Sequence, residues 1–207
     1  MMPTLIPGDN IYVNKWIMGG RIFDVEESFH RQVEISRLPG DTLEIRNGYF
    51  RVNGTDEQLG NAEAQEAISR LKGIPEERVA FDAFPYSDLF GWTIKEFGPY
   101  HIPQGGMTVP MDSLTATLYH KLIRWEQKKP VAWSDGKVML GDSLIHEYTF
   151  KENYYFTAGD NGLNSRDSRY WGPVPEPFIV GVATRIWKSV DKYTDEWRSD
   201  RFLKEIK

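Results

Sequence analysis

The chain has 207 residues, of which 40% are hydrophobic and 27% charged, as in a globular protein with one sizeable domain or two small ones. Its net charge of −5, with acidic and basic residues interspersed, disfavours nucleic acid as a partner, because neutralising phosphates requires a basic face. The sequence has no cysteine, which excludes disulfides, zinc–thiolate sites and thiol nucleophiles, and no apolar run approaches the roughly 18 residues of a membrane span.

Short runs of Val, Ile, Tyr and Phe, broken by Gly, Pro, Asn and Asp, predict a mainly β protein with an antiparallel sheet core. Residues 10–14 (NIYVN) alternate between polar and apolar and predict a strand. Residues 41–53 (DTLEIRNGYFRVN) predict a hairpin, in which Asn47 and Gly48 supply the two central residues of a type I′ turn.

Two helices are expected next. Asn61 can cap a helix that runs to Leu71 and is closed by Gly73. Asp112 or Ser113 can cap a second helix. Residues 98–106, between the two expected helices, predict turns and short strands. The second helix carries an apolar stripe that we expect to face the core, made of Leu114, Leu118, Leu122, Ile123 and Trp125.

Strand patterns return from Lys137 onward, in residues 137–140, 147–150, 153–160 and 178–187. The last of these runs is long enough for a fully buried strand, and the polar tail from Lys188 predicts a loose helix. The pattern predicts three parts: a β core domain of residues 1–54 plus 137–190, an inserted mixed α/β subdomain of residues 55–136 that resembles a cap, and a polar C-terminal tail of residues 191–207.

Three stretches carry a resemblance when they are taken together: MMPTLIPGDNIYVNK from Met1, LPGDTLEIRNGYFRVNG from Leu38, and GDNGLNSRDSRYWGPVP from Gly159. In this order and spacing the chain resembles bacterial type I signal peptidases, also called leader peptidases. The resemblance implies a membrane-anchored, antiparallel β-sheet fold of the signal peptidase type, on the outer, periplasmic face of the bacterial cytoplasmic membrane. It also implies an endopeptidase that removes leader peptides from exported preproteins after small-x-small motifs.

The family uses a serine nucleophile and a lysine general base. A serine hydroxyl becomes reactive only when a base takes its proton. A lysine can be that base only if burial in apolar surroundings lowers its pKa by several units from about 10.4.

Both members of this dyad are absent from the present sequence. The resemblance places the serine directly before Met1, and the lysine and the arginine after it at Val33 and Glu34. A strand that the family has before the lysine is also missing, so Gly40 and Asp41 mark a junction where we expect an internal segment to be absent. The chain as it stands is therefore expected to be inactive. The alternative is a non-catalytic signal-peptidase-like protein that serves in binding or assembly.

The rest of the site follows from the resemblance, position by position. Ser165 matches the hydroxyl that orients the lysine ammonium, and Asp167 and Arg169 match an acid–base pair that braces the same loop. Asp160 and Asn161 match residues that shape the loop.

Met1, Leu5 and Ile11 match apolar residues around the shallow pockets for small leader side chains. The resemblance implies no cofactor, and the four scattered histidines have no metal-ligand spacing.

Two further patterns allow more than one interpretation. Trp16, Ile17, Met18 and Phe23 form an apolar cluster, either a buried loop or an edge that dips into the membrane surface. Residues 141–144 (GDSL) spell the nucleophile motif of a lipase and esterase family. That assignment is disfavoured because no histidine follows His146 and the surroundings read as strands.

Overall fold

The computed structural model of the protein describes residues 6, 8–14, 34–55, 60–71, 82–159, 162–163 and 165–206. The chain divides into two compact units, one of residues 1–32 and 177–207 and the other of residues 33–176. The three-part division expected from the sequence stays a prediction.

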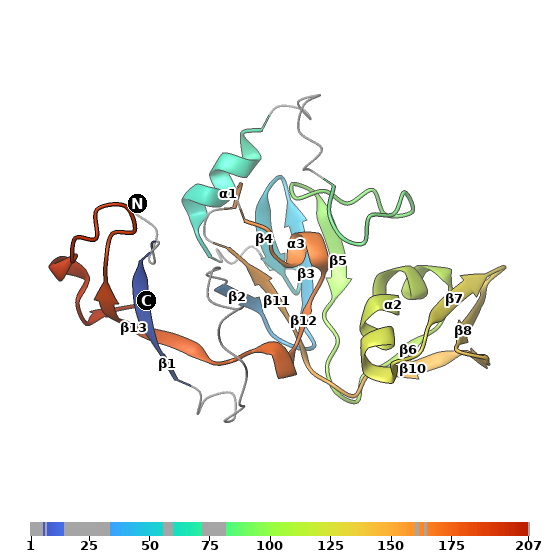
Figure 1. The fold of residues 1–207 in the computed structure, drawn as a ribbon. Coiled ribbons are helices and arrows are strands. Elements are labelled where there is room, and N and C mark those ends of the chain that lie inside the picture. Colours follow the sequence, from blue (N-terminus) through green and yellow to red (C-terminus); the bar gives the residue numbers. More distant parts are fainter. Residues whose placement is uncertain are drawn as a thin grey trace. The chain divides into compact units, whose positions relative to one another are not determined.

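The larger unit contains the predicted hairpin. Strands β3 (Thr42–Arg46) and β4 (Tyr49–Val52) pair antiparallel around a two-residue turn. Asn47 and Gly48 have φ values of 50° and 85°, as a type I′ turn requires, so the hairpin prediction is confirmed. Strand β5 (Phe97–His101) pairs with the other edge of β3, which gives a three-stranded sheet in the order β4-β3-β5 (Figure 1).

A second three-stranded sheet of this unit is centred on β11 (Tyr154–Ala158). Strand β2 (Glu34–Arg37) lies along one edge of β11, and the short β12 (Val174–Pro175) lies along the other. Both pairings are antiparallel. Because β11 leads directly into the loop from Gly159, this sheet anchors the motif singled out by the sequence.

The remaining strands of the larger unit form two small sheets close to helix α2 (Ser113–Gln127). Strand β6 (Thr108–Pro110) pairs with β10 (Glu147–Thr149), and β7 (Val131–Ser134), β8 (Lys137–Leu140) and β9 (Ser143–Ile145) form a meander beside α2 (Figure 1). The GDSL residues lie in the β8–β9 hairpin, as their strand-like surroundings predicted. Every pairing between the described strands is antiparallel, so the predicted fold class is confirmed.

Both predicted helix caps are present. The side chain of Asn61 accepts a hydrogen bond from the Ala64 amide at the start of α1 (Ala62–Ser69). Asp112 and Thr115 form a reciprocal capping box at the start of α2. Helix α1 ends at Ser69, before the predicted Leu71, and Gly73 lies outside the described residues. In the described part of the chain, no helix has both the length and the apolar character needed to cross a membrane.

The apolar stripe predicted for α2 is correct in its C-terminal half and wrong at Leu114. Leu122 and Ile123 are buried, whereas 51% of Leu114 is exposed. The buried face is completed by Ala116 and Tyr119. Tyr119 stands three residues after Ala116, and three and four residues before Leu122 and Ile123, so these side chains share one side of the helix. Leu114 lies two positions before Ala116, about 200° around the helix, and therefore faces away from the core.

Aromatic side chains dominate the core of the larger unit. Phe97 and Tyr100 of β5 are buried among Phe84, Trp92 and Phe156, with ring centroids 4.6 to 6.3 Å apart. The buried cluster to which they belong extends from Leu43 to Phe156. Its members thus all come from the continuous stretch of residues 33–176.

The smaller unit joins the two ends of the chain. Strand β1 (Asp9–Asn14), as predicted for residues 10–14, pairs antiparallel with β13 (Val182–Ser189), whose other edge pairs with β14 (Lys204–Glu205). The expectation that residues 178–187 form a fully buried strand is wrong. Ile186 is fully buried but 44% of Trp187 is exposed, because a small sheet has only one face to cover.

The polar C-terminal residues are also folded differently from the predicted loose helix. They form the 3-10 turn η3 (Ser199–Arg201) and β14. Short polar segments carry little periodicity, so this arrangement depends on contacts that β13 provides.

Two turns of the chain have the same construction. In residues 6–9 and in residues 38–41, the aspartate amide donates to the carbonyl three residues earlier. In return, the aspartate carboxylate accepts a hydrogen bond from the amide of that earlier residue, Ile6 or Leu38. Gly8 and Gly40 have φ values of 101° and 89°. Gly8-Asp9 and Gly40-Asp41 therefore precede or begin β1 and β3 with the same pattern of hydrogen bonds.

Candidate active-site loop

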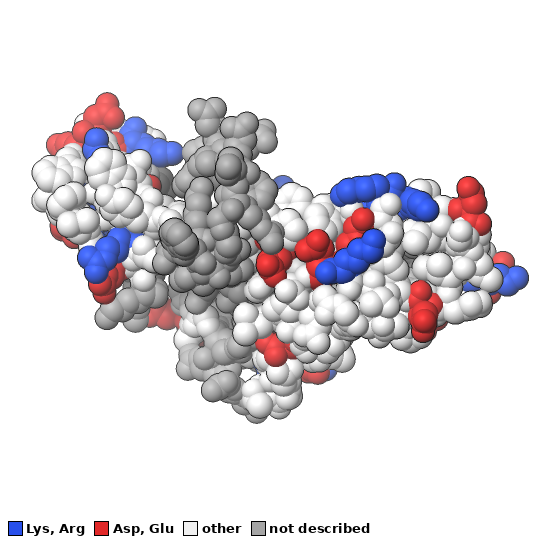
Figure 2. Space-filling view, turned by 90° about the horizontal axis from the view of Figure 1, so that it is seen from below, with Lys and Arg blue, Asp and Glu red and all other residues white. Residues whose placement is uncertain are grey.

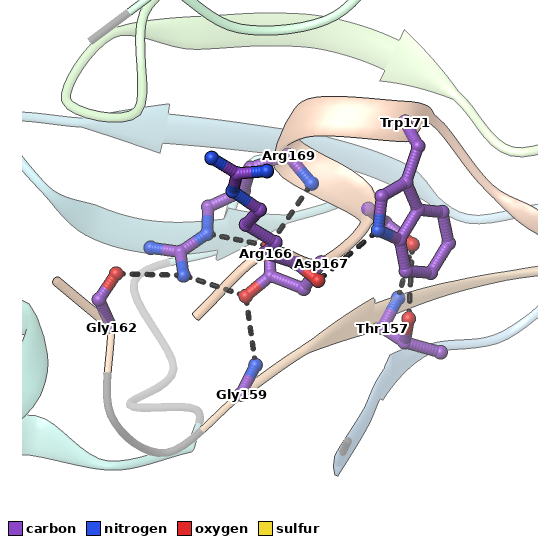
Figure 3. A network of polar contacts seen from close by, with 8 residues as sticks. Thr157, Gly159, Gly162, Arg166, Asp167, Arg169 and Trp171 are labelled. Atoms are coloured by element: carbon purple, nitrogen blue, oxygen red, sulfur yellow. Dashed lines mark hydrogen bonds and ion pairs between the residues drawn. The ribbon is translucent and has the colours of Figure 1, made fainter. Parts of the chain in front are cut away.

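Residues 159–167 connect β11 with the short helix α3 (Ser168–Trp171), and Asp167 caps that helix. The Asp167 carboxylate has four hydrogen-bond donors around it (Figure 3). Its Oδ1 accepts from the backbone amide of Arg169 at 3.2 Å and from the Nε of Arg169 at 2.8 Å. Its Oδ2 accepts from the Nη2 of Arg169 at 2.6 Å and from the Gly159 amide at 2.9 Å.

Arg169 connects the two sides of this loop. Its Nη2 also donates to the carbonyl of Gly162 at 3.0 Å (Figure 3). The side chains of Arg169 and Asp167 are 1% and 0% exposed. Two buried charges are tolerated only when they are paired and hydrogen-bonded. The pair therefore holds Gly159 and Gly162 close to the start of α3.

Ser168 also stabilises this loop, a role that the sequence did not predict. Its buried Oγ accepts a hydrogen bond from the Thr157 amide at 3.0 Å and lies 3.0 Å from the Thr157 Oγ1. These contacts hold α3 against β11. The only signal in the sequence is the doubled Ser-Arg in SRDSR, which does not say which serine faces the sheet. Trp171 adds a further contact, from its Nε1 to the Arg166 carbonyl at 3.1 Å (Figure 3).

Of the eight residues that the resemblance singles out, the structure brings Asp167 and Arg169 into contact. Ser165 is half-buried and stands two residues before Asp167 on the same loop. Ile11 belongs to β1 in the smaller unit, opposite Ile186 of β13. The others lie outside the described residues: Met1, Leu5, Asp160 and Asn161, together with the apolar cluster of Trp16, Ile17, Met18 and Phe23. The catalytic and pocket roles of these residues stay predictions.

The titratable groups near this loop include two tyrosines. Burial raises the pKa of Tyr86 and the pKa of Tyr170 above the ordinary value of a phenol. A phenol is protonated at neutral pH even without this shift, and burial strengthens that preference. Among the described residues, no three His, Cys, Asp or Glu side chains are grouped so that they could hold a metal ion. Figure 2 shows acidic and basic residues interspersed over the described part of one face.

Comparison with known proteins gives one consistent family. The sequence profile of the family described as "Signal peptidase, peptidase S26" matches residues 1–188. A protein named Signal peptidase I from Buchnera aphidicola subsp. Schizaphis graminum is 51% identical over 239 aligned positions. That match covers all of this chain and 70% of the relative.

Two further relatives carry the same name. The protein from Buchnera aphidicola subsp. Acyrthosiphon pisum is 60% identical over 232 positions, with 95% of this chain and 68% of the relative covered. The protein from Pseudomonas fluorescens is 27% identical over 208 positions, with 91% of this chain and 62% of the relative covered. The matched region therefore spans about two thirds of the length of these relatives. The chain belongs to the signal peptidase family, peptidase S26.

Proposed function

We propose that the natural protein is a type I signal peptidase that removes N-terminal leader peptides from exported preproteins after small-x-small motifs. The observation that carries this proposal is the family match over residues 1–188, with relatives named Signal peptidase I at 51% and 60% identity. The reaction is hydrolysis of one peptide bond by a serine nucleophile that a lysine activates.

The described loop has a clear part in this proposal. Ser165, the candidate for orienting the lysine ammonium, lies two residues before Asp167. A hydroxyl can orient an ammonium only if its own position is fixed by a surrounding shell. We infer that the buried Asp167–Arg169 pair supplies that rigidity, together with the contact between Ser168 and Thr157.

We further propose that this 207-residue chain lacks an internal segment of the active enzyme. The alignment with the first Buchnera relative has 239 positions, so at least 32 of them hold a residue of the relative and none of this chain. The mismatch of Val33 and Glu34 with the lysine motif, just before a well-matched hairpin, favours Gly40–Asp41 as the junction. The alternative remains a lysine-less relative that binds without cutting.

A cleavage assay separates these two functions. The 207-residue chain is expected to leave a preprotein with a small-x-small site intact. The form encoded by the genomic sequence, with a serine before Met1 and the lysine segment restored, is expected to cleave it at one bond. The binding function would be favoured if the natural protein had the mass of the 207 residues alone and still bound the preprotein. Cleavage by the unaltered chain would contradict the missing dyad.

The membrane is part of the same proposal. We place the catalytic domain at the outer, periplasmic face of the bacterial cytoplasmic membrane. The apolar cluster of Trp16, Ile17, Met18 and Phe23 is a candidate for contact with the membrane surface, since aromatic side chains favour the headgroup region.

A single substitution tests that contact. Trp16→Asp is expected to weaken binding to liposomes of anionic lipids at least about threefold while thermal unfolding stays unchanged, because a carboxylate disfavours the interface. Tyr193→Asp, at an aromatic side chain that is almost fully exposed, is the matched control and should bind like the parent. Equal binding of all three proteins would favour the buried-loop interpretation instead.

A further inference from the structure

The two ends of the described chain meet in a buried ion pair. Asp9, at the start of β1, contacts Arg201 of η3, which stands 192 positions later. The Nε of Arg201 donates to Oδ1 at 3.0 Å, and its Nη2 donates to Oδ2 at 2.5 Å. The Asp9 and Arg201 side chains are 2% and 6% exposed. A bidentate contact of this kind fixes distance and orientation together.

The turn that Asp9 closes also contacts the backbone just after β13. Val190, directly after β13, donates its amide to the Gly8 carbonyl at 3.0 Å. A Cβ on Gly8 would lie 1.8 Å from the Val190 carbonyl oxygen, so only glycine fits at this approach. The Ile6 amide donates to the Asp9 Oδ2 at 2.9 Å. The carboxylate therefore links the turn of residues 6–9 to the C-terminal segment.

The C-terminal segment has the internal contacts needed to present Arg201. Arg198 forms an ion pair with Asp191, and its amide donates to the Ser189 carbonyl at 3.0 Å. The Asp191 carboxylate also accepts from the amides of Tyr193 and Thr194. Residues 189–201 thus form an ordered loop and not a loose tail.

We infer that Arg201 is a positioning residue of the protease: through Asp9 it fixes Ile6 and the start of β1, which stand between the predicted pocket residues Leu5 and Ile11 in the sequence. Asp9 stands between these two residues in the sequence, and Ile6, which it holds, directly follows Leu5. This inference rests on the proposed function for the roles of Leu5 and Ile11. The contact itself is independent of those roles. Loss of the pair would displace the segment, and displacements of about 1 Å can lower a rate by about 10²-fold.

The first test is kinetic and uses the enzyme with its serine and lysine restored. Arg201→Ala and Asp9→Asn are each expected to lower kcat about tenfold, with the KM for a leader peptide changed less than about twofold, because a displaced pocket misaligns the bound peptide with the nucleophile more than it weakens binding. The double variant should be no slower than either single variant. Arg201→Lys, which keeps the charge, should recover part of the rate.

Arg185→Ala is the matched control. Arg185 of β13 forms an ion pair with Glu205 at 2.5 Å in the same sheet, but those side chains are 50% and 58% exposed. Its kcat and KM should equal those of the parent. If Arg201→Ala and Arg201→Lys are folded and both keep the parent kcat, the positioning role is overturned.

The second test does not need catalysis. Amide hydrogen exchange of Ile6 and Asp9 in the 207-residue chain is expected to be at least about tenfold faster in Arg201→Ala than in the parent or in Arg185→Ala. Unchanged exchange would overturn the inference by itself. If the restored parent enzyme does not cleave, that result counts against the proposed function alone, because the exchange rates still decide whether Arg201 fixes the turn.

Discussion

At the scale of single residues, two ion pairs with the same spacing in the sequence differ in burial and therefore in their contribution to stability. Asp167 and Arg169 form an ion pair across two positions of the chain, and so do Glu44 and Arg46. The first pair is fully buried, whereas the second lies at the surface of β3. An exposed pair contributes about 0 to 1 kcal/mol, while removing one partner of a buried pair leaves an uncompensated charge in the interior.

Asp167→Ala should therefore destabilise the protein strongly. We expect the free energy of unfolding to fall by about 3 to 5 kcal/mol, since Arg169 would keep its charge without its carboxylate partner. Glu44→Ala is the matched control and should change it by less than about 1 kcal/mol. Urea unfolding followed by tryptophan fluorescence measures both. Equal effects of the two substitutions would show that the loop opens to water around Arg169.

The Asp9 carboxylate makes a prediction about pH. Burial works to raise its pKa, but hydrogen bonds from Arg201, Ser189 and the Ile6 amide, with the charge of Arg201, outweigh burial and lower it. The unfolded chain, with an aspartate pKa of about 3.9, then binds the proton more readily than the folded chain. The stabilisation is complete well above pH 4 and is lost as the pH falls below it. The free energy of unfolding, measured from pH 6 to pH 3, should fall less steeply in Asp9→Asn.

At the scale of elements, the sequence predicted secondary structure correctly where a local side chain or a glycine determines the backbone conformation. Asn47-Gly48 predicted the β3–β4 hairpin, and Asn61 and Asp112 predicted the starts of two helices. What failed was burial. Leu114 and Trp187 are apolar and stand in regular elements, yet both are exposed, because the partner that would cover a given face is not encoded in that element.

Two hairpin turns allow a test of how firmly α1 packs against the β3–β4 hairpin. Gly48 of the β3–β4 turn and Gly136 of the β7–β8 turn occupy the same turn position, with φ values of 85° and 73°. A Cβ on Gly136 would meet nothing within 4 Å, whereas a Cβ on Gly48 would lie 2.9 Å from the backbone nitrogen of Ser69 at the end of α1.

We expect Gly136→Ala to lower the free energy of unfolding by about 1 kcal/mol, the strain of a left-handed alanine. Gly48→Ala should lower it by at least about 2 kcal/mol, because α1 must also shift. Thermal and urea unfolding of both variants give the comparison. If the two losses were equal, α1 would not be packed firmly on the hairpin.

At the scale of the whole molecule, the motif in the sequence located the loop between β11 and α3, but the sequence did not predict the contacts that hold the ends of the chain. The SRDSR box placed Asp167 and Arg169 on one short loop, where a bidentate pair is easily anticipated. The contact between Asp9 and Arg201 gave no such signal. Its partners are 192 positions apart, and a tail rich in Lys, Asp and Arg is typical of a solvated segment. Only the folded structure, in which Asp9 of β1 contacts Arg201 of η3, reveals a pair this far apart in the sequence.

The division of the molecule leads to the last prediction. The buried aromatic cluster lies within residues 33–176, whereas the boundaries expected from the sequence, at 54/55 and 136/137, cut through sheets. Strand β5 pairs with β3 across the first boundary, and β6 pairs with β10 across the second.

A fragment of residues 33–176 should therefore unfold in one cooperative urea transition, because it retains its core and all of its strand pairs. A fragment of residues 55–136 is the control and should lack a cooperative transition, since β5 and β6 would have lost their partners and exposed their edges. Circular dichroism and urea titration distinguish the two outcomes. Cooperative unfolding of the shorter fragment would favour the inserted subdomain expected from the sequence, with the β3–β5 pairing contributing little to its stability.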